Sequence, residues 1–284
     1  MISTISKIVI GTAQLENYYG IKDKNKFLSL KDFNKILINS KKNKINLLDT
    51  AFNYPKVHDN LSKAKISRMN IITKIKNSDF NDKLETKIEK SLKKLKTKFF
   101  YGVLFHETDF YKNKNFKTAL SILKKLKKKK KILKIGVSIY EPNDLKKILK
   151  LFRPDIVQFP FNILDDYFYR SGWLKKLKKL KIECHARSIF LQGKLLKKFK
   201  ISSKVNKSHI KKISLLENWY KKKKISRLQA CLNKAFTNNL IDKVIIGFKN
   251  INEFDQVAKL VINCKAEYPP NINFEKNFID PRKW

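Results

Sequence analysis

Short apolar runs alternate with longer segments of helical periodicity along almost the whole chain. Eight runs are mostly continuous rather than alternating, as expected for parallel strands that are covered on both faces. We predict these strands at Lys7–Ala13, Asn46–Thr50, Asn70–Ile75, Tyr101–His106, Leu133–Ser138, Asp155–Phe159, Ile182–Arg187 and Lys243–Gly247.

The segments between these runs space apolar residues three and four positions apart, which is typical of amphipathic helices. The pattern is less clear in residues 55–66 and 167–180, after the second and the sixth strand. Clear apolar stripes lie at Phe33–Leu37, Leu84–Leu95, Leu120–Leu126, Leu145–Leu149, Leu228–Phe236 and Phe254–Val261.

This alternation predicts a parallel sheet with right-handed crossovers. Eight units in 284 residues favour an α/β fold closed into a (β/α)8 TIM barrel over an open sheet. The sequence has neither the GxGxxG turn of an open dinucleotide-binding sheet nor a GxxxxGK[ST] phosphate loop. With only seven glycines and seven prolines, it contains no flexible linker, so we expect a single domain over 1–284 with a short tail at 265–284.

The formal net charge of +41 would ordinarily suggest a nucleic acid or an acidic membrane as partner. The excess is lysine, however, and arginine, whose fork suits phosphates and bases, stands at only six positions. The densest run, Lys124–Lys131, continues an amphipathic helix and is typical of a solvated face. We therefore expect no specific nucleic acid partner, and keep polyanion binding as an alternative.

The cysteines and the apolar runs indicate in which cellular compartment the protein is expected and whether it has a zinc site. Cys184, Cys231 and Cys264 are far apart and form no CxxC pair, which indicates reduced thiols and no zinc site. No apolar run approaches the roughly 18 residues that span a bilayer, and the start lacks the features of a signal peptide. We expect a cytoplasmic protein without membrane contact.

Four titratable residues follow the ends of three consecutive predicted strands, where barrels carry their functional groups. Asp49 and Tyr54 follow the second strand, Lys74 ends the third and His106 ends the fourth. Singly, each has an ordinary structural explanation, such as an ion pair or a histidine at the rim. Together they have the groups that reduction of a carbonyl requires.

A carbonyl that accepts hydride develops negative charge on its oxygen and needs a proton there. Tyr54 can supply it if Lys74 lowers the pKa of the phenol toward neutrality, and Asp49 would keep Lys74 charged. His106 can hydrogen-bond the substrate oxygen and stabilise the developing charge. The set therefore predicts a carbonyl reductase.

The same residues resemble the aldo-keto reductase superfamily over nearly the whole chain. Asp49–Tyr54 matches the family's Asp-Thr-Ala-x-x-Tyr motif, and Lys74 and His106 fall where the family has its catalytic lysine and histidine. Further matching blocks are Gly11–Gln14, Gly136–Ile139, Asp155–Asn162, His185–Leu196 and Val244–Asn250. The resemblance implies that Tyr54 donates the proton, that Lys74 and Asp49 tune it, and that His106 positions the carbonyl.

The resemblance also implies a nicotinamide cofactor. NADP(H) is favoured over NAD(H), because Lys249 can meet the 2′-phosphate, although Glu253 stands where the family often has arginine and could favour a ribose hydroxyl. The cofactor-binding residues implied are Gly11, Thr12, Asp49, Ser138, Gln158, Arg187, Ser188, Gly193, Gly247 and Lys249.

Three departures from the family pattern surround the candidate cluster. Ile139 replaces the usual asparagine, and Arg187 stands where an aromatic ring often stacks on the nicotinamide. After Tyr54, the loop Pro55–Asp59 replaces Gly-x-Ser/Asn-Glu, and we expect its His58 to be a loop or surface residue rather than a second acid. The pocket around the cluster is therefore expected to differ from the family pattern.

The working hypothesis is NAD(P)H-dependent reduction of an aldehyde or ketone. Several blocks resemble bacterial members associated with sugar metabolism, which suggests a small, sugar-derived carbonyl substrate. Two alternatives stay open: a cofactor-binding barrel recruited for a regulatory or binding role, and a lysine-rich protein that binds polyanions. The oligomeric state is not predicted.

Overall fold

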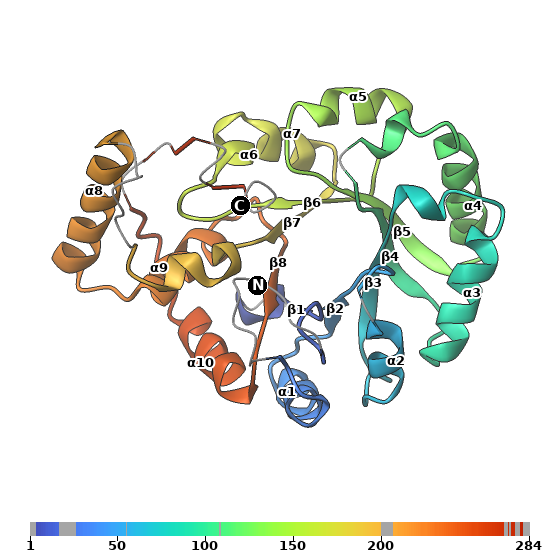
Figure 1. The fold of residues 1–284 in the computed structure, drawn as a ribbon, viewed down its shortest axis with the longest axis horizontal. Coiled ribbons are helices and arrows are strands. Elements are labelled where there is room, and N and C mark those ends of the chain that lie inside the picture. Colours follow the sequence, from blue (N-terminus) through green and yellow to red (C-terminus); the bar gives the residue numbers. More distant parts are fainter. Residues whose placement is uncertain are drawn as a thin grey trace.

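Eight parallel strands close into a barrel that is surrounded by helices (Figure 1). The structure is a computed structural model, and it describes residues 4–16, 27–54, 56–107, 109–199, 207–269, 272, 274, 275, 279 and 280. The strands are β1 (Ile8–Gly11), β2 (Leu47–Asp49), β3 (Asn70–Ile75), β4 (Phe100–Phe105), β5 (Ile132–Ser138), β6 (Ile156–Pro160), β7 (Glu183–Arg187) and β8 (Lys243–Gly247). The predicted (β/α)8 barrel is thereby confirmed, and each predicted strand overlaps an observed one.

Each strand pairs in parallel with the next, and the pairing of β1 with β8 closes the barrel. Because all strands run the same way, their C-terminal ends meet at one mouth of the barrel. Gly11 and Gly247 are register partners at that mouth. The strand ends identified in the sequence therefore converge in space.

The helices cover the outer face of the barrel (Figure 1). They are α1 (Leu30–Lys42), α2 (Val57–Ser62), α3 (Leu84–Lys94), α4 (Phe116–Lys128), α5 (Asp144–Leu151), α6 (Tyr167–Arg170), α7 (Trp173–Lys179), α8 (Lys207–Lys223), α9 (Arg227–Phe236) and α10 (Ile251–Ile262). The two segments with a less clear helical pattern contain α2 after β2 and both α6 and α7 after β6, while α8 was not predicted. The predicted tail 265–284 and the loop after Tyr54 fall partly outside the described residues.

Side-chain caps mark where several helices begin. The Ser29 hydroxyl accepts the Asp32 N–H at the start of α1, and the Asn250 side chain accepts the Glu253 N–H at the start of α10. Each cap satisfies one of the backbone donors that a helix start leaves unpaired. Short polar residues before the apolar stripes thus determine where these helices begin.

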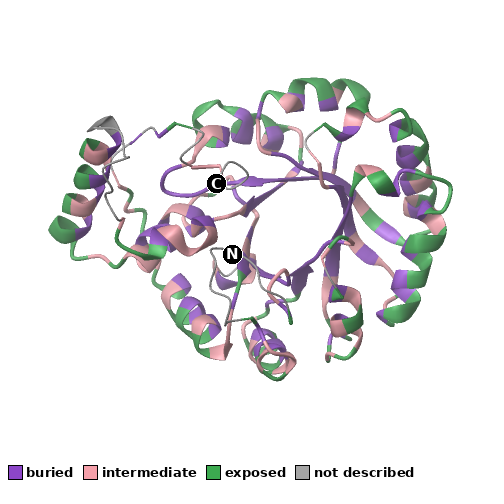
Figure 2. Ribbon diagram, in the orientation of Figure 1, coloured by how far each residue is buried: buried purple, intermediate pink, exposed green. Residues whose placement is uncertain are grey.

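Most of the apolar core lies between the strands and the helices (Figure 2). Inside the barrel, an apolar layer from five strands contains Val9, Leu47, Ile72, Leu104 and Ile156. Gly136 permits close packing in this interior, because an added Cβ would lie 2.6 Å from the Ile156 carbonyl oxygen. The interior is therefore filled rather than open.

A second apolar cluster lies beside the barrel. Leu191 and Leu195, in the 3-10 turn η4 (Leu191–Leu196), pack with Ile213 and Leu216 of α8 and with Cys231 of α9. Figure 1 shows α8 at the outer edge of this cluster. The segment between β7 and β8 thus adds structure outside the regular strand–helix repeat.

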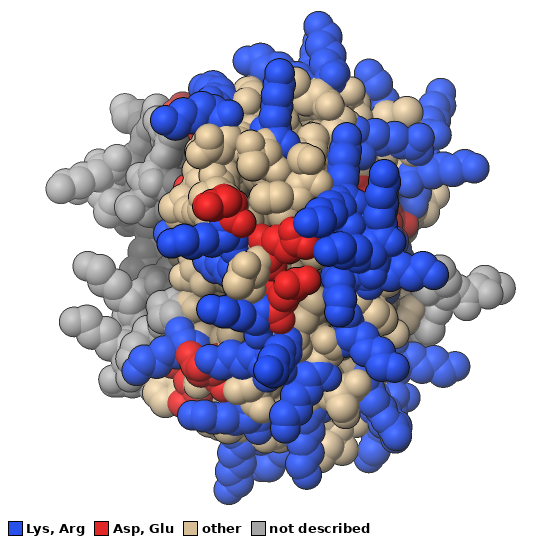
Figure 3. Space-filling model, turned by 90° about the vertical axis from the view of Figure 1, so that its right-hand side faces the viewer, with Lys and Arg blue, Asp and Glu red and all other residues tan. Residues whose placement is uncertain are grey.

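Lysine side chains spread over the face that contains α3 and α4 (Figure 3). Lys125 and Lys129 form ion pairs with Glu85 at 2.8 and 3.0 Å, and Lys127 pairs with Asp155 at 2.5 Å. The run that contains these lysines is the solvated face of α4 and the turn after it, as predicted. Within the described part of the chain, no helix has the length and apolar character needed to cross a bilayer.

Candidate active site

Asp49 and Lys74 form a buried ion pair at the C-terminal mouth of the barrel. Asp49 is the last residue of β2, and Lys74 lies near the end of the neighbouring strand β3. The Lys74 ammonium donates to Asp49 Oδ1 at 2.5 Å and to the Thr50 carbonyl at 3.0 Å. The two side chains are only 6% and 2% exposed, so each depends on the other for compensation of its charge.

Two further strands hold Asp49 in place. Gln158 on β6 donates from its side-chain nitrogen to Asp49 Oδ2 at 2.8 Å. The Thr12 hydroxyl and backbone N–H, just after β1, donate to the Asp49 carbonyl at 3.1 and 3.0 Å. Two residues that the sequence assigned to the cofactor therefore also bond Asp49 directly.

Tyr54 and His106 lie next to this ion pair. The Tyr54 ring is centred 5.8 Å from the Lys74 ammonium nitrogen and 6.3 Å from the His106 ring, with the two rings nearly perpendicular at 78°. No residue that the structure describes hydrogen-bonds the Tyr54 hydroxyl or the His106 imidazole. The four predicted residues, Asp49, Tyr54, Lys74 and His106, thus form one group, which we call the upper cluster.

The pKa of Tyr54 shifts in the direction opposite to our expectation. Burial raises this pKa above its ordinary value, and the Asp49 carboxylate adds to the increase, while Arg187 opposes it. Lys74 does not reverse this increase, because Asp49 at 2.5 Å compensates most of the lysine charge. Tyr54 therefore keeps its proton at neutral pH.

His106 is a neutral imidazole at neutral pH. Burial, followed by the positive charges of Lys74 and Arg187, lowers its pKa to about 4. A neutral ring retains one N–H donor and carries no charge of its own. His106 can therefore donate a hydrogen bond to a substrate oxygen over a wide pH range.

Arg187 adds a positive charge near the upper cluster. It ends β7, and its guanidinium lies 4.1 Å from the centre of the Tyr140 ring. The guanidinium also donates to the Ser188 hydroxyl at 3.4 Å and to the Ile139 carbonyl at 3.5 Å. Its charge acts on the pKa values of both Tyr54 and His106. Tyr140 was not predicted as a site residue, although it stands two residues after the end of β5.

A cavity of about 240 Å³ lies between the loops that follow β5, β6 and β7. Its lining includes the rings of Tyr140 and Tyr167 and the carboxylates of Glu141 and Asp165. Burial raises the pKa of Asp165 to about 6. These side chains were not predicted from the sequence, because Tyr140, Glu141 and Asp165 stand in loops and Tyr167 begins the short helix α6, none of them within a recognisable motif.

The remaining predicted cofactor residues lie on separate segments at the same mouth. Ser138 and Gln158 are register partners on β5 and β6. Gly193 has a φ of +86° within η4. The Lys249 N–H donates to the Glu253 carboxylate at 2.8 Å, so Glu253 already occupies part of the α10 N-terminus.

His58 has a structural role near the site. His58, which we expected in a loop or at the surface, lies within α2, where its Nδ1 bonds the Ser91 hydroxyl at 2.9 Å. That expectation was wrong, because the loop after Tyr54 enters a helix at Val57. Among the described residues, no group of three or more His, Cys, Asp or Glu side chains could hold a metal ion.

Comparisons with known proteins agree with this geometry. A family model described as "Aldo/keto reductase family" matches residues 7–267. The aldo-keto reductase AKR11C1 from Bacillus halodurans, in its holo form, is similar with a TM-score of 0.69 and 15% identity, over 94% of this chain and 95% of that chain.

An aldo/keto reductase from Klebsiella pneumoniae, solved in complex with NADP and acetate, is similar with a TM-score of 0.66 and 16% identity. The match covers 90% of this chain and 85% of that chain. At such identities, these likenesses establish the fold. No curated protein sequence matches this chain.

Proposed function

Because the chain belongs to the aldo/keto reductase family, we propose that it reduces an aldehyde or a ketone with NADPH and that Tyr54 delivers the proton. Membership of this family makes it an NAD(P)-dependent oxidoreductase. One observation carries the proposal for its residues: Tyr54 and His106 flank the buried Asp49–Lys74 pair at the C-terminal mouth. This is the mouth at which barrel enzymes bind their substrates.

When bound, the nicotinamide cofactor supplies the hydride. His106 donates a hydrogen bond to the carbonyl oxygen of the substrate and holds it near Tyr54. As the carbonyl carbon gains hydride, its oxygen takes the π electron pair and removes the proton from Tyr54. The Tyr54 O–H bond breaks and the alcohol O–H bond forms. The negative charge thereby moves from the substrate oxygen to Tyr54, which becomes a transient tyrosinate.

Lys74 stabilises that tyrosinate. Its ammonium nitrogen lies 5.8 Å from the centre of the Tyr54 ring, and Asp49 fixes it there. In the resting state, the raised pKa of Tyr54 keeps the proton on the phenol. An alkoxide is a much stronger base than a phenolate, so the transfer remains favourable despite this pKa.

The residues beside the cluster fit a nicotinamide carboxamide. Gln158 uses its side-chain nitrogen for Asp49, which leaves its carbonyl oxygen as an acceptor, and the Ser138 hydroxyl is next to it in the register. We favour NADP(H) over NAD(H), since Lys249 supplies a cation after β8 and the similar Klebsiella enzyme was solved with NADP. Glu253 does not oppose this choice strongly, because its carboxylate is held by the Lys249 N–H.

The cavity after β5, β6 and β7 favours a substrate with several hydroxyl groups. Glu141 and Asp165 present carboxylates that accept hydrogen bonds from hydroxyls, and the rings of Tyr140 and Tyr167 offer flat apolar faces. Such a lining suits a small, sugar-derived carbonyl compound. Its position beside Ser188 connects it to the segment assigned to the nicotinamide half of the cofactor.

Cofactor oxidation with a panel of carbonyl compounds tests the proposal. Purified protein is mixed with NADPH or NADH and with glyceraldehyde, erythrose, benzaldehyde or hexanal. We expect oxidation of NADPH, fastest with the two polyhydroxylated aldehydes, and weaker binding of NADH. Tight NADPH binding without oxidation by any carbonyl compound would instead support a barrel recruited for regulation or binding.

A further inference from the structure

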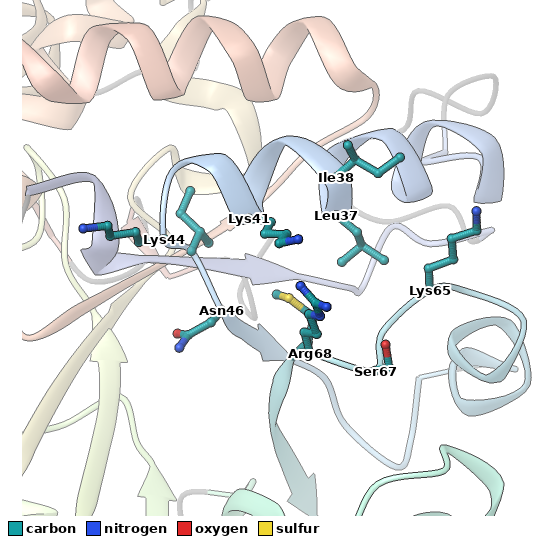
Figure 4. A pocket seen from close by; sticks show the side chains of 10 residues that line it. Leu37, Ile38, Lys41, Lys44, Asn46, Lys65, Ser67 and Arg68 are labelled. Atoms are coloured by element: carbon teal, nitrogen blue, oxygen red, sulfur yellow. The ribbon is translucent and has the colours of Figure 1, made fainter.

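A cationic pocket lies at the end of the barrel opposite the upper cluster. Its volume is about 410 Å³, within the range of roughly 300–1,000 Å³ that is common for small-molecule sites. It lies between α1 and the loop that leads into β3, and its polar lining comes from residues that precede β2 and β3 (Figure 4). The pocket is thus separate from the mouth that holds Tyr54.

Four cations line this pocket without an acidic side chain among the lining residues. They are Lys41, Lys44, Lys65 and Arg68. Within the described ranges, none of the four has a carboxylate partner within 4 Å, whereas lysines of α3 and α4 are paired with Asp59, Asp79, Glu85 and Asp155. The pocket therefore concentrates positive charge that no carboxylate of the described residues compensates by an ion pair.

The side chains of Lys41 and Arg68 point toward one another across the pocket (Figure 4). Two like charges held face to face repel, and an anion between them removes that repulsion. Lys41 also stands in the last turn of α1, where a cation suits the helix dipole. That explanation does not cover Lys65 and Arg68, which follow α2 and belong to another segment.

One wall of the pocket is apolar, in contrast to the cationic lining, and this indicates a ligand that has both a charged and an apolar part. Leu37, Ile38 and Met69 line the pocket, and Ile38 is 54% exposed. An arginine fork with nearby lysines matches the geometry and the double charge of a phosphate group. We propose that this pocket binds a small organic phosphate, with its phosphate between Lys41 and Arg68 and its apolar part against Leu37, Ile38 and Met69.

Calorimetric titration with phenyl phosphate tests the proposal. The titration uses the full chain at physiological salt with saturating NADPH, so that phosphate sites at the upper mouth are occupied. Phenol and inorganic phosphate are the two partial probes, one without the charge and one without the apolar part. We expect one phenyl phosphate per chain, bound more tightly than either partial probe.

Two double variants with the same change in charge locate the site. Lys41→Gln with Arg68→Gln removes the facing pair, while Lys124→Gln with Lys128→Gln removes two exposed lysines of α4 that have no carboxylate partner in the described chain. We expect the pocket variant to weaken phenyl phosphate binding about tenfold or more and the α4 variant less than about twofold. Thermal melting of both variants verifies that they fold.

Three results would overturn the proposal. The first is no binding at millimolar phenyl phosphate, and the second is phenol binding as tightly as phenyl phosphate. The third is equal weakening by both double variants, which would indicate attraction by the lysine-rich surface as a whole. None of these results depends on carbonyl reduction, so failure here and failure of the proposed function are distinguishable.

Discussion

The two ends of the barrel carry the same four kinds of side chain in different states of bonding. Each end has a carboxylate, a tyrosine, a lysine and a histidine. At the C-terminal ends of the strands these form the upper cluster of Asp49, Tyr54, Lys74 and His106. Near the N-terminal ends lies a lower cluster of Glu183, Tyr101, Lys134 and His185.

In the lower cluster, all four side chains hydrogen-bond within the cluster, and of their buried nitrogen and oxygen atoms only His185 Nδ1 has no partner among the described residues. The Tyr101 hydroxyl donates to Glu183 at 2.8 Å and accepts from Lys134 at 2.7 Å, and His185 Nε2 bonds Glu183 at 3.1 Å. Burial alone would raise the pKa of Glu183, but the hydrogen bonds from His185, Lys134 and Tyr101 outweigh it and lower this pKa to about 2. This is the arrangement of a structural network.

In the upper cluster, only the carboxylate and the lysine are bonded in this way. The Tyr54 hydroxyl and the His106 ring have no hydrogen-bond partner among the described residues, yet both lie beside a buried charge pair. Because these two polar groups have no partner among the described residues, they can hydrogen-bond a substrate. The comparison teaches that residue types alone do not distinguish a candidate catalytic cluster from a structural one.

Replacing the tyrosine of each cluster should give the largest difference between the two clusters, measured as the loss of kcat. Tyr54→Phe removes the proposed proton donor, and we expect kcat for the best carbonyl substrate to fall by a factor of about 10² to 10⁴. Tyr101→Phe should leave kcat within about twofold, because Tyr101 lies at the opposite end. NADPH binding, measured separately, should be unchanged in both variants, and equal loss of kcat in both would contradict the distinction.

Replacing the two lysines should separate the clusters by stability. Lys74→Met leaves Asp49 charged, buried and without its ion partner, so we expect the free energy of unfolding to fall by about 3–5 kcal/mol. Lys134→Met should cost about 1 kcal/mol, because that pair is partly exposed to water. Urea denaturation measures both, and adding Asp49→Asn to Lys74→Met should recover part of the loss.

Acidification should lower the free energy of unfolding through the two ends in different pH ranges. We expect this effect to be smaller than those of the Tyr54 and Lys74 replacements. The lowered pKa of His106, about 4, gives a stabilisation that is complete above the ordinary value of 6.5 and is lost as the pH falls toward 4. The lowered pKa of Glu183, about 2, gives one that is complete above 4.5 and is lost as the pH falls toward 2. Each change is at most about 3 kcal/mol, and solvent screening reduces it further for the more exposed Glu183.

Urea midpoints as a function of pH test this order. His106→Gln should flatten the curve between pH 6.5 and 4, and Glu183→Gln should flatten it below pH 4.5. Part of the upper slope should persist in His106→Gln, because burial also lowers the pKa of His58 to about 4. An unchanged upper slope in a variant that lacks both histidines would contradict the assignment.

Local pattern was sufficient to predict the barrel and the members of the upper cluster. Continuous apolar runs indicate strands that are covered on both faces, and the residue after each run lies at the C-terminal mouth. Asp49, Lys74 and His106 could therefore be identified from their position at strand ends. The helix α8 escaped prediction because its lysine-rich sequence, Lys207–Lys223, shows only a weak apolar stripe.

Only the closed barrel decided which of these groups bond one another. Gln158 reaches Asp49 across 109 residues of chain, and Tyr101 reaches Glu183 across 82. The sequence by itself determined the strand order, the fold class and the Asp-Thr-Ala-x-x-Tyr segment, because these follow from periodicity and local motif. The direction of the Tyr54 pKa shift was decided by tertiary structure, since burial and the pairing of Lys74 with Asp49 exist only after folding.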